Sequence, residues 1–320
     1  MKFAWFIVFL CIIAGCDRER EERPVRIAVS LGGTDVLTET KHIQGMTEAA
    51  ENTKVDITWR TAHGDYALQK RQIDTLLAKD HDIIVVEVVD PRKADEIFGR
   101  IKRSGLPVIG FNRLAPGFQY DLIVSPDYRT IGRELAEIIG ERYGNGKKNV
   151  LLLHGLLFND RESIFIEGFL DALEQFDDFT VTKFEAVHLD NGPTGRIEVP
   201  GFKNAAVLHN IDIAIATNSF LTRFVGMGIK LMDAEGTEHR TPFIVGFDEK
   251  DLFTFLNIEY NNLLVIDRLT YDAGIQLINA AYDYARGEFR HPDGSVIRIG
   301  DHIIPVVYTP HKFVFTDEEK

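Results

Sequence analysis

The chain has 320 residues, of which 45% are hydrophobic, and it carries a formal net charge of −13. An acidic chain without a block rich in Lys and Arg is a poor match for nucleic acid or for an anionic lipid surface. The two cysteines, Cys11 and Cys16, both lie near the start, so the body forms no internal disulfide and depends on a hydrophobic core, which a chain of this length can build in about two domains.

The first 16 residues, MKFAWFIVFLCIIAGC, form a distinct segment. Lys2 gives a positive start, an uncharged apolar run follows, and two small residues precede Cys16, which is the order of a secretory signal. The run is shorter than the roughly 20 apolar residues of a transmembrane helix. Cys16 resembles the lipobox cysteine of bacterial lipoproteins, which is acylated and becomes the new N-terminus. The alternative is an anchor or buried helix with an incidental cysteine.

A charged stretch, residues 17–24, then reads as a short tether, although it could also begin a helix. From Val25 onward, short apolar runs alternate with amphipathic stretches. The expected strands are 25–31, 55–62, 82–89, 107–112, 121–125, 149–153, 181–189, 211–217 and 242–247. The expected helices are 41–52, 66–79, 91–104, 128–144, 161–175 and 219–232.

This alternation predicts an α/β fold with parallel sheets that helices cover on both faces. About four strand–helix units precede Arg113 and about five follow it, which is too many for one open sheet. We therefore expect two doubly wound parallel-sheet lobes. An eightfold barrel is the alternative architecture.

Polar and aromatic side chains follow the strands, where parallel α/β sheets bind their ligands. These positions hold Ser30, Leu31, residues 62–65, Asp90, Asn112, Arg113, His154, Asn218, Phe247 and Asp248. Carboxylate, amide and guanidinium groups can bracket hydroxyls, and an aromatic ring can cover an apolar sugar face, so a small polyol is the expected ligand. The structural alternatives are helix caps for Asp90, Asn218 and Asp248, a surface ion pair for Arg113, and core packing for the phenylalanines.

Several motifs occur in an order that resembles a known family. They are residues 82–90 followed by a helix and 105–113, then Arg161 to Phe169, Thr217-Asn218, Val245-Gly-Phe-Asp248, and 265–274. Together they resemble periplasmic sugar-binding proteins of the ribose, galactose and xylose type, which have the type I periplasmic binding fold. The resemblance implies two lobes joined by three hinge crossovers. It assigns 25–112 and about 268–301 to one lobe and 113–267 to the other, and leaves 302–320 unassigned.

The resemblance also implies a ligand-binding set. That set is Asn112, Arg113, Asn218, Asp248, Arg268, Asp90, Asp65, Phe165 and Phe247. Three positions depart from the family pattern. Asn112 replaces an aspartate, Arg268 replaces Gln or Asp, and Phe165 stands about where a second sugar-binding arginine is expected, with Arg161 one helical turn earlier. A site with Arg113 and Arg268 would suit an anionic or boron-bridged sugar, unless Arg268 pairs with Asp248.

The resulting hypothesis is an extracytoplasmic solute-binding lipoprotein in the periplasm or on the cell surface. It would capture a monosaccharide or related polyol as a monomer and deliver it to an ABC transporter permease. The alternative is a receptor of the same fold that signals to a membrane sensor kinase or chemoreceptor. Motifs for hydrolase elbows, phosphate loops, zinc proteases and EF-hands are missing from the sequence, so we expect neither an enzyme, a metal site nor a cofactor. A cytosolic repressor is disfavoured by the export signal.

Overall fold

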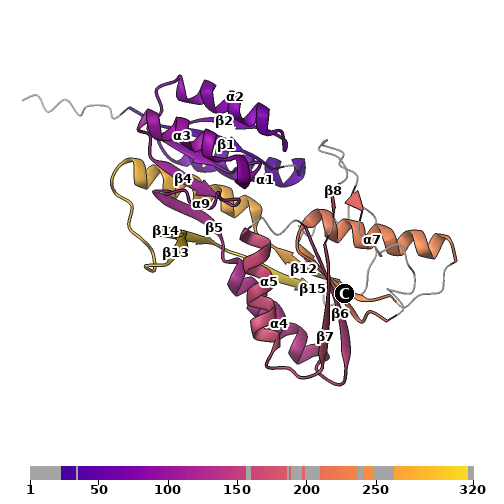
Figure 1. The fold of residues 1–320 in the computed structure, drawn as a ribbon. Coiled ribbons are helices and arrows are strands. Elements are labelled where there is room, and N and C mark those ends of the chain that lie inside the picture. The colour runs from indigo at the N-terminus through magenta and orange to yellow at the C-terminus, as the bar shows by residue number, and fades with distance from the viewer. Residues whose placement is uncertain are drawn as a thin grey trace, which may run out of the picture.

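The computed structural model describes residues 23–33, 35–155, 160–185, 187–188, 197–198, 210–236, 241–247 and 263–315. The expected signal segment with Cys16, most of the tether and Asp248 lie outside these ranges. The described residues form two α/β lobes (Figure 1). This confirms the expected fold, and the two separate sheets exclude the barrel alternative for these residues.

The first lobe is built on a seven-stranded sheet with the order β13-β14-β5-β4-β3-β1-β2. Its strands are β1 (Val25–Leu31), β2 (Val55–Thr61), β3 (Ile83–Val86), β4 (Val108–Phe111), β5 (Leu122–Pro126), β13 (Val296–Ile299) and β14 (His302–Thr309). Its helices are α1 (Val36–Asn52), α2 (Tyr66–Leu77), α3 (Asp95–Ser104) and α9 (Thr270–Ala285), with a 3-10 turn at Pro91–Lys93. All neighbouring strands are parallel except β13, which is antiparallel to β14.

Alternate residues of β1 enter different cores, as the period of two along a strand requires. Ile27 and Val29 pack with α1 and α9, whereas Ala28 packs with α2 and α3. The first-lobe sheet is therefore covered on both faces (Figure 1). Helix α1 approaches α9 closely at two glycines, because a Cβ on Gly45 or on Gly274 would overlap a backbone oxygen of the facing helix.

The second lobe has a six-stranded sheet with the order β15-β12-β11-β10-β6-β7. Its strands are β6 (Lys148–His154), β7 (Phe179–Glu185), β10 (Ile213–Ala216), β11 (Phe243–Phe247), β12 (Leu263–Asp267) and β15 (Lys312–Phe315). Helices α4 (Tyr128–Tyr143) and α5 (Asp160–Leu173) contribute to one core of this lobe, and α7 (Ser219–Ala234) contributes to the other. Two short antiparallel strands, β8 (Val187–His188) and β9 (Ile197–Glu198), form a separate ribbon.

The described chain passes between the lobes three times, from β5 to α4, from β12 to α9 and from β14 to β15. The first passage follows Pro126, later than the expected boundary at Arg113. The reason is that β5 pairs in parallel with both β4 and β14 and so extends the first sheet. The segment left unassigned by the sequence contributes to both lobes, since β14 lies in the first sheet and β15 lies antiparallel to β12 in the second.

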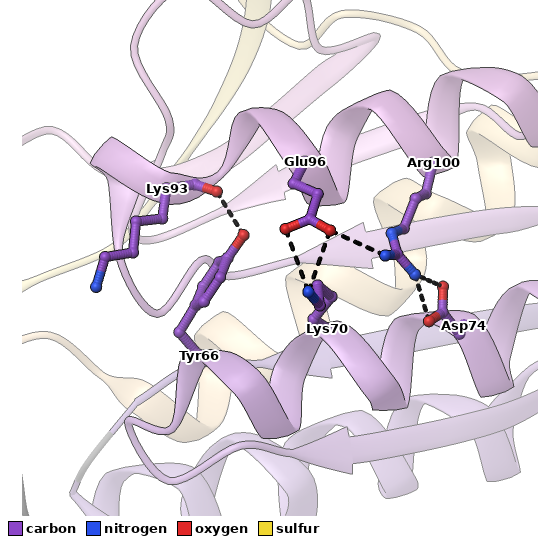
Figure 2. Close-up of polar contacts among 6 residues, drawn as sticks. All are labelled: Tyr66, Lys70, Asp74, Lys93, Glu96 and Arg100. Carbon is purple, nitrogen blue, oxygen red and sulfur yellow. Dashed lines mark hydrogen bonds and ion pairs between the residues drawn. The ribbon is translucent and has the colours of Figure 1, made fainter.

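A network of polar contacts joins α2 to α3 on the surface of the first lobe (Figure 2). Lys70 Nζ lies 3.1 Å from a carboxylate oxygen of Glu96, which also accepts a hydrogen bond from Arg100 at 3.0 Å. Arg100 in turn pairs with Asp74 on α2. An exposed ion pair of this kind contributes about 1 kcal/mol or less to stability when it stands alone.

Of the helices that the structure describes, none combines the length and the apolarity that a membrane span requires.

Candidate functional site

A pocket lies at the carboxyl ends of the second-lobe strands, where the sequence predicted a ligand site. It is lined by Tyr128, Arg161, Glu162, Thr217, Asn218, Phe247 and Arg268. The cavity among these side chains has a volume of about 20 Å³, which is room for about one water molecule. Three of its residues, Asn218, Phe247 and Arg268, belong to the predicted set.

Glu162 organises one wall of the pocket. Its Oε2 accepts hydrogen bonds from the Gly155 backbone N–H at 2.8 Å and from Thr217 Oγ1 at 2.6 Å. Its Oε1 accepts a third from Asn218 Nδ2 at 3.1 Å. A buried carboxylate with this many donors holds them in fixed orientations. Glu162 thus positions the two residues that follow β10.

Asn218 caps a helix and also lines the pocket. Its Oδ1 accepts a hydrogen bond from the Leu221 backbone N–H at 2.9 Å, which caps the start of α7. At the same time its amide is held by Glu162 and lines the pocket. The cap fixes the side chain so that the remaining amide donor can face a ligand.

Aromatic side chains form another wall. The Phe247 ring lies in the pocket, with the Arg268 guanidinium carbon 5.9 Å from its centroid. Phe165 is 1% exposed and meets Phe247 edge-on at 5.1 Å between centroids. Phe165 therefore supports the ring that lines the pocket from within the core. Nearby, the hydroxyl of Tyr128 is buried and has no hydrogen-bond partner, which leaves a polar group for a ligand to satisfy.

Asn112 and Arg113 follow β4 in the first lobe and are buried and half-buried respectively. The φ of Asn112 is 50°, in the left-handed region that Asn tolerates better than most residues. Arg113 donates from Nη1 to the Val88 and Val89 carbonyls at 3.1 and 3.3 Å. Burial and then Arg161 lower the pKa of Arg113, while Glu87 and Glu162 oppose them. Arg113 is thus within electrostatic reach of both lobes.

Asp65 and Asp90 cap helical segments of the first lobe. Asp65 accepts a hydrogen bond from the Leu68 N–H at 2.9 Å, and it is exposed. Asp90 accepts one from the Arg92 N–H at 3.0 Å and pairs with the Arg92 and Lys93 side chains. Burial would raise the pKa of Asp90, but the contacts with Arg92 and Lys93 lower it overall. Neither aspartate lines the pocket.

The first lobe also contains buried ionisable groups that were not predicted. Burial, Glu87 and Asp35 raise the pKa of Glu39 to about 8, against the opposing effect of Arg113. Burial, with Arg268 and Arg161, lowers the pKa of His42 to about 3, so this imidazole is neutral. Glu87 carried a recognisable signal, because it is a charged residue inside the apolar run 82–89.

Other pocket residues were missed because of where they lie in the sequence. Glu162 falls within the first turn of an expected helix, and Tyr128 begins another, so both resembled ordinary helical residues. Tyr128 comes just after β5, and strand ends were the criterion that found Asn112 and Asn218. Applying the same criterion to β5 would have included it.

The family model described as "Periplasmic binding protein domain" matches residues 27–288 of the sequence. The xylitol-binding protein of Mycolicibacterium smegmatis is 26% identical over 145 residues, which are 45% of this chain and 41% of that protein. The D-xylose-binding periplasmic protein of Escherichia coli is 21% identical over 191 residues, 58% of this chain and 56% of that protein. The matches thus span about half the length of these curated relatives.

Solved structures share the fold over most of the chain. A glucose-galactose binding protein from Geobacillus stearothermophilus has a TM-score of 0.71 at 15% identity, covering 93% of this chain and 99% of its own. A periplasmic ribose ABC transporter protein from Conexibacter woesei has a TM-score of 0.70 at 20% identity, covering 92% and 93%. The family match and the shared two-lobed fold together show that the chain belongs to the periplasmic binding protein domain family.

Proposed function

We propose that the chain captures a small sugar or polyol between its two lobes and delivers it to the permease of an ABC transporter. The observation that carries this proposal is the pocket itself. Glu162 orients Thr217 and Asn218, Phe247 supplies an aromatic face, and the buried Tyr128 hydroxyl has no partner. Fixed hydrogen-bonding groups beside an aromatic ring suit a molecule with many hydroxyls and one apolar face.

The relatives support a small ligand of this class, since one is a xylitol-binding protein and another is a D-xylose-binding protein. Membership of a family of binding proteins agrees with the prediction that the chain is not an enzyme. We further propose that Asn112, Arg113, Asn218, Asp248 and Arg268 contact the ligand, with Phe247 stacking against it. In this proposal Phe165, Asp65 and Asp90 support the site from the core and the helix starts.

The experiment that tests the function is a thermal-shift screen with pentoses, hexoses, polyols and sugar acids. A ligand at about 100 times its Kd adds about 2.7 kcal/mol of stability, which raises the Tm by a few degrees in a protein of this size. A shift with one sugar class supports the proposal. If no member of the panel changes the Tm, the proposal fails.

A sensor partner is the second candidate. A protein of similar fold, with a TM-score of 0.69 at 17% identity, is the fructose-binding periplasmic domain of a hybrid two component system. Deletion of the gene separates the two cases. With a transporter partner, uptake of the radiolabelled ligand is lost. With a sensor partner, uptake continues and the transcriptional response to the ligand disappears.

We also propose that Cys16 is acylated and holds the protein to a membrane outside the cytoplasm, with residues 17–24 as the tether. Cys16→Ser is expected to release the protein from the membrane fraction or to leave it unprocessed and heavier. Cys11→Ser is the matched control, because it alters the other cysteine of the same segment and should change neither property. Unaltered fractionation and mass in Cys16→Ser would refute the anchor.

A further inference from the structure

Two buried carboxyl groups converge beside Gly33, at the carboxyl end of the first-lobe sheet. Glu39 comes from the first turn of α1 and is 4% exposed, and Glu87 follows β3 and is 5% exposed. A Cβ on Gly33 would lie 3.3 Å from Glu39 Oε1 and 3.6 Å from Glu87 Oε2. Both carboxyl oxygens therefore border the space that a side chain at position 33 would occupy.

One of these oxygens has no partner. Glu39 Oε2 lies 3.2 Å from His63 Nδ1, but Glu39 Oε1 is buried without any hydrogen bond. Leaving a buried polar atom unsatisfied costs about 1–3 kcal/mol. Such an atom is expected to have a donor in the working state of the protein. Because Oε1 borders the space at Gly33, a donor placed there would satisfy it.

The charged groups around Glu39 favour a positive donor. Glu87 and Asp35 are the anions that face it, His63 and Arg113 are the basic groups, and His42 on the same helix is neutral. Asp35 is itself paired with Arg223 from α7. Burial and the two anions outweigh Arg113 and hold a proton on Glu39 at neutral pH. The two anions, Glu87 and Asp35, also favour a cation placed beside Glu39.

A hydrogen bond links the surroundings of this acidic pair to the pocket of the second lobe: Asp35, which acts on Glu39, accepts it at 3.2 Å from Ser219, the neighbour of the pocket residue Asn218. Arg113 acts electrostatically on Glu39 and on Glu87, and also on the pocket residues Tyr128, Arg161 and Glu162. A ligand between the lobes that reaches the space at Gly33 with one end would meet both carboxyl groups. We propose that Glu39 and Glu87 form a subsite for an ammonium group, so that the bound sugar or polyol is an amino sugar or an amino polyol.

This inference rests on the proposed function and names its ligand class. On binding, the ligand ammonium replaces the proton of Glu39, which is released to solvent. The charge of the subsite is the same before and after the exchange. Affinity for an amine is therefore expected to rise as the pH increases toward about 8, the pKa of Glu39. Affinity for a neutral sugar involves no such exchange.

Calorimetric titration of the full chain tests the subsite. The probes are 1-amino-1-deoxy polyols and 2-amino-2-deoxy hexoses, each beside its neutral parent, at pH 6 and pH 8 and in two buffers of different ionisation enthalpy. We expect the amine to bind about 10-fold more tightly than its parent, which corresponds to about 1.4 kcal/mol, and to release a proton. Glu39→Gln and Glu87→Gln should each abolish this preference, whereas the exposed α1 variant Glu51→Gln should keep it.

The outcomes separate the two proposals. If neutral parents bind as tightly as the amines, and Glu39→Gln leaves their affinities unaltered, the ammonium subsite is refuted while sugar binding stands. If neither amines nor neutral sugars bind, both proposals fail. Two independent glutamine variants are used so that a folding defect in one does not decide the result, and a melting curve for each checks its fold.

Discussion

The carboxylate of Asp35 in the first lobe lies 2.5 Å from the guanidinium of Arg223 in the second. The same carboxylate accepts a hydrogen bond from Ser219 at 3.2 Å and caps α1 through the Leu37 N–H at 3.1 Å. Burial would raise the pKa of Asp35, but Arg223 and the backbone donors lower it overall. One side chain thus begins a helix and also joins the two lobes.

Breaking this pair should weaken ligand binding without altering the pocket. Both side chains are about a quarter exposed or less, so the pair is expected to contribute about 1 kcal/mol to the contact between the two lobes that encloses a ligand. Asp35→Asn and Arg223→Gln should each raise the Kd by a factor of about 5, and the double variant by no more than either. Calorimetry measures the Kd values, and Asp56→Asn on the exposed side of β2 is the control. Additive effects of the two substitutions would contradict the coupling.

The raised pKa of Glu39 predicts a pH dependence of stability. The folded protein holds the Glu39 proton up to about pH 8, whereas the unfolded chain releases it near pH 4.5. Between these values the folded state binds more protons, so the free energy of unfolding falls as the pH rises. Glu39→Gln should therefore be more stable than the parent at pH 8 by a few kcal/mol and should lose this advantage below pH 5. Urea unfolding at both pH values measures the difference, and a constant difference would count against a buried titrating group.

Glu39→Gln is thus expected to gain stability and to lose discrimination between ligands. A gain in stability together with a loss of function is common when a substitution removes a group that a binding site keeps in an unfavourable environment. The two effects come from the same buried carboxyl group beside Glu87 and Asp35.

Glu162→Gln should reduce affinity while the fold remains. An amide nitrogen in place of Oε2 cannot accept hydrogen bonds from the Gly155 N–H and from Thr217. Loss of these contacts frees Thr217 and Asn218 to turn, and we expect the Kd to rise roughly 10- to 100-fold, or about 1.4–2.7 kcal/mol. Glu167→Gln on the same helix is the control, because that exposed side chain pairs only with Arg129 among the interactions described. Equal affinity in both variants would remove Glu162 from the site.

Gly274→Ala should destabilise the first lobe. The new methyl group would overlap the His42 backbone oxygen where α9 crosses α1, and overpacking of this kind costs about 1–3 kcal/mol. Gly99→Ala is the matched control, since its nearest neighbour would be a flexible Arg103 nitrogen at 3.7 Å. Alanine has the better helix propensity, so this variant should match or exceed the parent in Tm. A Gly274→Ala protein with the parent Tm would show that the helices can separate without cost.

The clearest of the predicted strands have long apolar runs. Residues 82–89 and 107–112 each overlap a fully buried strand, β3 and β4. Strands β13 and β14 were not predicted, because β13 is largely exposed and β14 contains Pro305. A mixed pattern of burial gives no clear period in the sequence. The partner of β5 was therefore missing from the prediction, and with it the reason why β5 belongs to the first lobe.

The site shows a similar division. Asn218 and Phe247 lie at the ends of strands, were predicted from this position and from the family resemblance, and line the pocket. Glu162 and Glu39 were not, because their importance depends on what lies opposite them in the other parts of the fold. The convergence of Glu39 with Glu87 arises from the parallel placement of β1 and β3 beside α1, and local sequence patterns do not contain it.

The pairing of β5 with β14 also bears on how the protein is made. The first-lobe sheet needs a strand from residues 302–309 beside one from residues 122–126, and α1 needs α9. A growing chain therefore cannot complete its first lobe until nearly all of it has been synthesised. Contacts so distant in sequence slow folding. A chain that stays unfolded for longer remains available for threading through an export channel, so this topology would suit the export that we propose for the chain.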